Sequence, residues 1–145
     1  MNPFQLSFPD RLHAWRELRH ARNRLSDEEF IIQVDDWWQR APLVKQHLYW
    51  NDPENWSDPW TLLSENQYCL LTRAIGMIYS LILCGIDDVE LLMTTDGQCD
   101  EHYLVTVENA KYILNFWPKS VLSTTLTDFT VVRKLPIDSI IKKIK

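Results

Sequence analysis

Three residues have the side chains, and the order along the chain, of a thiol acyl-transfer site: Cys69, His102 and Asn115. Such a site needs a nucleophile, a base that takes up its proton and a third group that orients the base. Cys69 begins a long apolar segment that predicts a helix, and the dipole at a helix N-terminus stabilises a thiolate. His102 begins one predicted strand, and Asn115 lies near the end of the next.

The two strands, over 102–108 and 111–117, are predicted to form a hairpin around Asn109-Ala110. A two-residue turn there pairs His102 with Trp117 and Leu104 with Asn115. His102 and Asn115 then share one face as diagonal neighbours, about 7–8 Å apart, so we expect the amide to hold the imidazole. A four-residue turn keeps this pairing, whereas a three-residue turn destroys it. The opposite face is core-like and carries Tyr103, Val105, Val107, Tyr112, Leu114 and Phe116.

Two other interpretations of these residues stay open. Cys69 also fits a small buried hydrophobic residue, and His102 a hydrogen-bonded histidine at a loop edge. Cys84 and Cys99 would be further zinc ligands, but Cys69 and Cys84 lie about 22 Å apart if they belong to one helix, so both cannot bind one ion. We expect no metal site. We also expect no cofactor, because the sequence has neither a P-loop nor a glycine-rich dinucleotide turn.

The elements that must position these residues follow from the hydrophobic periodicity. Helices are expected over 8–25, from Ser26 to Pro42, over 59–64 and, as the central core helix, over 68–84, which Gly85 ends. Strands are expected over 89–94, in the hairpin and over 129–135, and a short helix or strand over 136–145. Helices followed by antiparallel strands predict an α+β fold, with the N-terminal helices and the central helix packed on the sheet.

The 145 residues fit a single domain, 1–145. We divide it into a helical, tryptophan-rich part over 1–65, a core over 66–135 and a basic tail over 136–145. Six of the seven tryptophans lie in the first 60 residues. The spacing places Trp15, Trp37 and Trp60 in the core, and leaves Trp50 and Trp56 partly exposed as interface anchors.

The net charge of −5 is unevenly distributed. Residues 1–25 have a balance of +3, residues 26–132 of −12 and residues 133–145 of +4. The simplest interpretation is solvated faces, and the sharper one is a bipolar molecule that docks between partners. We expect contacts with other proteins through the basic termini and the tryptophan-rich segment, with Phe4, Leu6, Phe8, Ile141 and Ile144 exposed. The acidic middle makes the body a poor binder of nucleic acid.

Nothing in the sequence predicts a membrane protein. The longest uncharged apolar segment, 74–86, is too short to span a bilayer. The N-terminal residues have neither the basic nor the apolar region of a signal peptide. Three cysteines at irregular spacing favour a reducing compartment, so we expect a cytoplasmic location or an assembly formed there.

The segments ENQYCLLTRAIGMIYSLILCGID, VELLMTT and EHYLVTVENAKYILNFWP resemble the core of the transglutaminase-like superfamily, which is distantly similar to papain-type cysteine proteinases. The shared pattern is a cysteine that opens a core helix ending in Gly-Ile, a strand, a histidine that opens the next strand, and an Asp or Asn after it. The resemblance implies Cys69 as nucleophile, His102 as base, Asn115 as orienting group, and Gln67 or Asn66 as oxyanion donors. The family usually has Gly-x-Cys before the helix and Asp as the third member, and this chain has neither.

The N-terminal segment FPDRLHAWRELRH, with the tryptophan-rich segment through DPWTLLSENQYC, resembles small virion proteins of contractile-tailed bacteriophages. This implies a structural or assembly protein of a tail, baseplate or neck, located in the host cytoplasm during assembly and then in the virion. Enzyme folds are often reused in this way. The alternative is an active cysteine hydrolase or acyl-transferase with a Cys-His-Asn triad.

Overall fold

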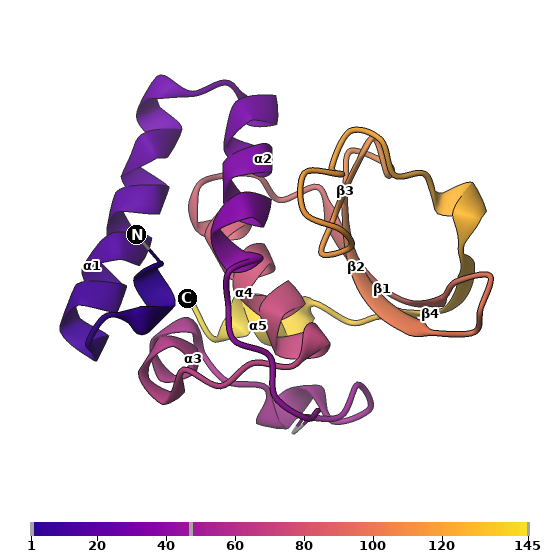
Figure 1. Cartoon of the computed structure of the whole chain (residues 1–145), viewed down its shortest axis with the longest axis horizontal. Helices are drawn as coiled ribbons and strands as arrows, with labels where there is room; N and C mark the ends of the chain where they lie inside the picture. Colours follow the sequence, from indigo (N-terminus) through magenta and orange to yellow (C-terminus); the bar gives the residue numbers. More distant parts are fainter. Residues whose placement is uncertain (1, 47, 145) are drawn as a thin grey trace.

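A computed structural model gives the structure of residues 2–46 and 48–144, and these residues form the expected α+β fold. Helices lie on one side of a four-stranded antiparallel sheet (Figure 1). The helices are α1 (Phe8–His20), α2 (Asp27–Trp38), α3 (Pro59–Glu65), α4 (Leu70–Leu83) and α5 (Asp138–Lys142). The strands are β1 (Val89–Thr95), β2 (Glu101–Val107), β3 (Tyr112–Leu114) and β4 (Thr130–Leu135), in the spatial order β3-β2-β1-β4.

Local sequence signals set the helix boundaries. Ser26 and Glu29 form the predicted capping box at the start of α2, because each side chain bonds the backbone N–H of the other residue. The Asp58 carboxylate accepts the N–H of Thr61 and caps α3. Gly85 follows α4 with a φ of 85°, a conformation that glycine adopts without strain. None of the helices in the described part of the chain has the length and hydropathy needed to cross a bilayer.

One hydroxyl group of the central helix α4 forms hydrogen bonds with both α1 and α2. Ser80 Oγ accepts the indole N–H of Trp15 and that of Trp38, both at 2.9 Å, and donates to the carbonyl of Gly76 at 2.9 Å. The ring of Trp38 lies directly over Gly76, where an added Cβ would be 2.5 Å from the nearest ring atom. Gly76 is therefore required by the close approach of α2 to α4.

The hairpin register agrees with the sequence prediction, although the turn does not. β2 and β3 pair Val107 with Tyr112 and Val105 with Leu114, as a two-residue turn would require. The connection is instead four residues long, 108–111, with three of them at positive φ. Such a turn preserves the register because its length differs from the expected one by an even number of residues.

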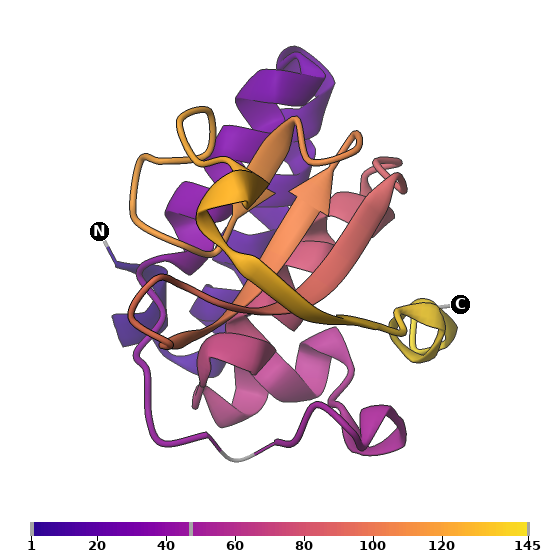
Figure 2. The same cartoon turned by 90° about the vertical axis from the view of Figure 1, so that its right-hand side faces the viewer.

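The two faces of the sheet are covered differently. The helices cover the face that carries Tyr103, Val105 and Val107, which belong to the main core. On the outer face, Leu104 and Ile113 are buried under the connection between β3 and β4, where the N–H of Ile113 donates to the carbonyl of Val121. This connection arches over the sheet on the side away from the helices (Figures 1 and 2).

Two of the tryptophan predictions are wrong. Trp15 and Trp37 are buried and Trp50 is half-buried, as expected. Trp56, predicted to be partly exposed, is buried, with its indole N–H donating to the carbonyl of Tyr49 at 3.0 Å. Trp60, predicted to be core, is 45% exposed, because the short α3 turns its other side inward.

We expect Gly76→Ala to lower the free energy of unfolding by about 1–3 kcal/mol, since the new methyl group must displace a ring that is fixed by its bond to Ser80. The loss should occur although alanine is the better helix former by about 1 kcal/mol. Gly97→Ala is the matched control, because its Cβ would meet nothing within 4 Å. Urea unfolding of both variants gives the comparison, and equal stabilities would contradict the close approach.

Candidate functional site

Cys69 lies at the N-terminus of α4, as predicted, but it is sealed in the core. Its side chain is 2% exposed and belongs to the main hydrophobic cluster. The Thr72 hydroxyl accepts the N–H of Cys69 at 2.8 Å and lies 3.6 Å from its Sγ. The backbone donor nearest to the thiol, which an acyl-transfer site would direct at an oxyanion, is thus already used within the helix.

His102 is on the face of the sheet opposite to Cys69. Successive side chains of a strand point to opposite faces. Tyr103, the next residue, points into the main core and interacts electrostatically with Cys69. The His102 ring instead packs edge-on against Phe116 and Phe129, with ring centroids 5.1 and 5.8 Å away. These rings belong to the outer layer, by which we mean the outer face of the sheet together with β4 and the connection from β3 to β4. The sheet therefore separates the proposed base from the proposed nucleophile.

The carboxylate of Asp96, in the β1–β2 turn, is the partner of His102. Asp96 Oδ2 lies 2.9 Å from Nε2 of His102. The other oxygen of Asp96 accepts the N–H groups of Gln98 and Asp100, which closes the turn. These hydrogen bonds, that of His102 foremost, hold the pKa of Asp96 below its ordinary value.

Asn115 does not reach His102 either, because β3 ends at Leu114 and Asn115 has a φ of 72°. This left-handed conformation, which asparagine tolerates better than most residues, interrupts the alternation of the strand. The Asn115 amide donates to the carbonyls of Tyr103 at 2.7 Å and Leu70 at 3.0 Å, and its oxygen accepts from Nε of Arg73 at 2.6 Å.

Asn115 thus belongs to a buried polar network between the helices and the sheet. Asp35 of α2 completes it, since its Oδ1 accepts the backbone N–H of Asn115 at 2.9 Å. Arg73 is 5% exposed and Asp35 1%. Burial raises the pKa of Asp35 and lowers that of Arg73, while the attraction between the two groups opposes both shifts.

The two candidate oxyanion donors lie elsewhere. Asn66 caps the C-terminus of α3 at a φ of 53°, and its amide donates to the carbonyl of Phe4 at 2.9 Å. Gln67 is exposed. Among the described residues, no hydrogen bond joins Cys69, His102 and Asn115 to one another, so the triad remains a prediction from the resemblance.

Besides the Thr72 hydroxyl, the phenol of Tyr103 interacts with Cys69. Its hydroxyl donates to Glu101 at 2.5 Å and accepts from Gln46 at 3.2 Å. Burial, followed by the bond to Glu101, raises the pKa of Tyr103 to about 12. The phenol therefore keeps its proton at neutral pH and is unsuited to act as the base for a thiol.

Sequence reasoning missed the partners of each candidate residue. The Asp96-Gly97 turn was predicted, but the proximity of its carboxylate to His102 was not. Arg73 carried a signal, because it is a charged residue inside an otherwise apolar helix and must be paired when buried. Within 2–46 and 48–144, no cluster of three or more His, Cys, Asp or Glu side chains could hold a metal ion.

Comparison with the models of known protein families finds no match for this chain, and neither does comparison with curated proteins. The likeness to the transglutaminase-like superfamily therefore depends on the sequence pattern alone.

We expect Asn115→Ala to lower the free energy of unfolding by about 3–5 kcal/mol, because it leaves Arg73 and two carbonyls unpaired in the interior. Asn115→Gly should recover about 1 kcal/mol of this loss, since glycine adopts the positive φ freely. The matched control is Asn109→Ala, because Asn109 is exposed and has a φ of 55°. This variant should lower the free energy of unfolding by about 1 kcal/mol. Equal losses for Asn109→Ala and Asn115→Ala in urea unfolding would mean that the network adds no stability.

Proposed function

We propose that this protein is a structural or assembly component of a larger particle, and that it binds neighbouring proteins through the outer layer of its sheet. The observation that supports this proposal is a set of exposed apolar side chains on β4 and on the connection before it. Val131 and Val132 of β4 are 46% and 50% exposed, and Trp117 and Leu122, in the connection before β4, are 67% and 58% exposed. Exposed apolar side chains gathered in one region are typical of protein interaction sites.

The edge of the sheet at β4 supports the same proposal. β4 pairs with β1 along one side and is the last strand of the sheet, so its other side presents backbone groups that a partner strand can pair with. All its residues before Leu135 are exposed. Arg133 stacks on Trp50 at 4.2 Å and Lys134 pairs with Glu90 at 2.8 Å, and such charges on an edge strand protect it from indiscriminate pairing.

The particle that we propose is the virion of a tailed bacteriophage, on the basis of the resemblance of the N-terminal part to virion proteins. The contribution of the basic termini differs from the one expected from sequence. Phe4 is buried in the core, and the other four apolar residues of the termini are partly buried: Leu6, Phe8, Ile141 and Ile144. The termini can therefore attract partners by charge, while the apolar contacts fall on the outer layer.

The alternative, a cysteine hydrolase or acyl-transferase, needs a reactive and accessible thiol. Free cysteines here differ clearly in exposure, since Cys99 is exposed, Cys84 is half-buried and Cys69 is buried. Burial also raises the pKa of Cys84. The three thiols can therefore be compared within one protein.

We expect iodoacetamide to label Cys99 first, Cys84 more slowly and Cys69 last, because alkylation needs an accessible thiolate. Peptide mass spectrometry at pH 6 and pH 8 measures the order, and labelling in urea is the control that all three sites can react. If Cys69 reacted ahead of Cys99 at pH 6, the thiol-enzyme alternative would replace the assembly role.

Photocrosslinking tests the assembly role directly. With p-benzoylphenylalanine at Val132, we expect a crosslink to another protein in the particle fraction of the cells that produce the assembly. The same group at Leu83, an exposed residue at the end of α4 away from the outer layer, is the matched control and should give none. Recovery of the chain only as a free monomer, with no crosslink at Val132, would rule out the proposal.

A further inference from the structure

A hollow of about 560 Å³ lies in the outer layer, between the β1–β2 turn and the ends of the connection from β3 to β4. Aromatic rings form part of its lining. Phe116 and Phe129 pack edge-to-face with centroids 5.0 Å apart, and Trp117 lies beside Phe116 at 6.1 Å. Trp117 is the aromatic side chain with no cover, at 67% exposed. A large indole ring left open at a concave surface is available to a ligand.

The remainder of the lining is acidic. Asp96, Asp100 and Asp128 contribute carboxylates, and none of the lysines and arginines among residues 2–46 and 48–144 lines the hollow. Asp96 is paired with His102, but within the described residues neither Asp100 nor Asp128 forms an ion pair with a basic side chain. The hollow therefore combines an open aromatic face with two uncompensated negative charges.

This combination selects a planar cation. An indole face attracts a cation through its quadrupole, and a guanidinium group stacks on such a ring while its N–H groups bond carboxylates at its edge. An ammonium group lacks the flat surface for stacking. A metal ion is not favoured, because the described carboxylates and histidine form no cluster of three that could hold one.

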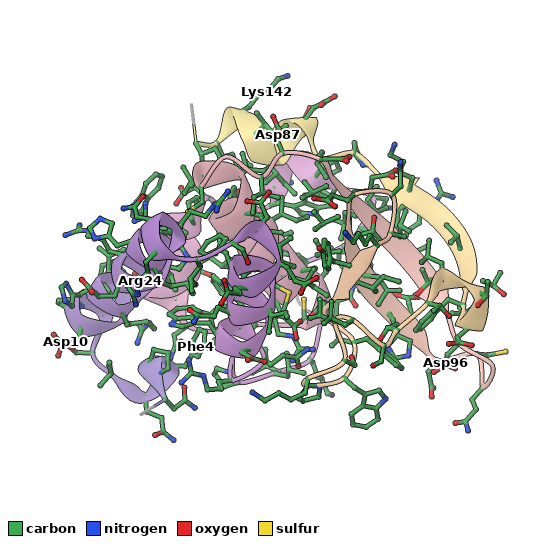
Figure 3. The ribbon with its side chains drawn as sticks, turned by 90° about the horizontal axis from the view of Figure 1, so that it is seen from above. Phe4, Asp10, Arg24, Asp87, Asp96 and Lys142 are labelled. Atoms are coloured by element: carbon green, nitrogen blue, oxygen red, sulfur yellow. The ribbon has the colours of Figure 1, made fainter. Side chains whose placement is uncertain are left out.

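We propose that this hollow binds the guanidinium group of an arginine side chain from another protein of the assembly. The inference deepens the proposed function and rests on it. The hollow lies at one end of the long axis, where Asp96 is labelled in Figure 3, and α1 with Arg24 lies at the other end. The basic N-terminal part therefore cannot fill the hollow of its own chain.

Another protein is a better source of the arginine than a second copy of this chain. Three of the five arginines in the basic segment 1–25 already interact within the chain. Arg11 donates to the carbonyls of Leu63 and Leu6, Arg19 stacks on Trp15 at 4.2 Å, and Arg22 pairs with Asp27.

The test uses N-acetyl-arginine amide as the probe and the indole N–H resonance of Trp117 in the full-length protein, assigned by its loss in Trp117→Ala. We expect a saturable shift with a dissociation constant of about 1–10 mM, as suits a single small cation. N-acetyl-citrulline amide, which has nearly the same shape but no charge, should give no shift. Equal shifts with both probes, or none with arginine, would overturn the proposal.

Matched variants test the residues. Asp128→Asn should weaken binding of the arginine probe about threefold or more, followed on the same indole resonance, because it removes the charge of one of the two carboxylates that have no basic partner; the Thr125 hydroxyl, which donates to Asp128 at 3.2 Å, does not neutralise that charge. Trp117→Ala should weaken it about tenfold, followed on the backbone N–H signals of the 96–100 turn. Asp87→Asn and Trp60→Ala alter exposed residues that do not line the hollow and should leave binding unchanged. If the control variants weakened binding of the arginine probe as much as the site variants do, the hollow would not be the binding site.

Two further results separate this inference from others. Sedimentation of the protein alone at low salt should show a monomer. Self-association that Trp117→Ala abolishes would mean that the arginine comes from a second copy of this chain and not from another protein. If the arginine probe fails to bind while the Val132 crosslink forms, the guanidinium site is wrong and the assembly role stands. If the probe binds and no crosslink forms, the assembly role is wrong, and with it the protein source of the guanidinium group.

Discussion

The burial of the Arg73 guanidinium between helices and sheet is the constraint on which the rest of the structure depends. A charge removed from water must be compensated by well-placed partners, or it destabilises the fold by several kcal/mol. Asn115 provides one acceptor, and Asp35, whose carboxylate binds the Asn115 backbone, provides the opposite charge. Asn115 meets these demands at the positive φ that follows the end of β3. The chain leaves the sheet there and covers its outer face, and the hollow beside Trp117 lies where this connection begins.

The elements and their register could be predicted, because local rules determine them. The capping box at Ser26, the glycine after α4 and the pairing of Val105 with Leu114 all follow from short-range patterns. The candidate site could not be predicted, because its geometry depends on single residues that depart from those patterns. Asn115 was placed by strand alternation, yet its left-handed φ takes it out of the strand. No rule of spacing gives the φ of one asparagine, whose side chain here pairs with a charged residue of α4.

The position of His102 is a different case, because the sequence already contained the answer. The hairpin face with Tyr103, Val105 and Val107 was correctly identified as core-like. An apolar central helix must pack on the core-like face, and Cys69 opens that helix. His102, which alternates with Tyr103, therefore had to point away from the thiol. The order Cys, His, Asn along a chain says nothing about faces, and a one-residue shift of the strand would exchange Tyr103 and His102. Where a catalytic motif combines a helix and a strand, the strand residue must point to the face of the sheet on which the helix packs, and this should be checked before roles are assigned.

The two surfaces proposed for partners are continuous along the chain, and this restricts how one partner could use both. Phe129, at the edge of the hollow, directly precedes Thr130, the first residue of the open edge strand β4. A partner strand paired along β4 would advance about 3.3 Å per residue. An arginine two or three residues beyond the partner residue that pairs with Thr130 would then reach the hollow. Backbone pairing along β4 is insensitive to sequence, whereas the acidic aromatic hollow accepts few side chains. Strand addition would then supply most of the affinity and the arginine most of the specificity, with a fixed register between them.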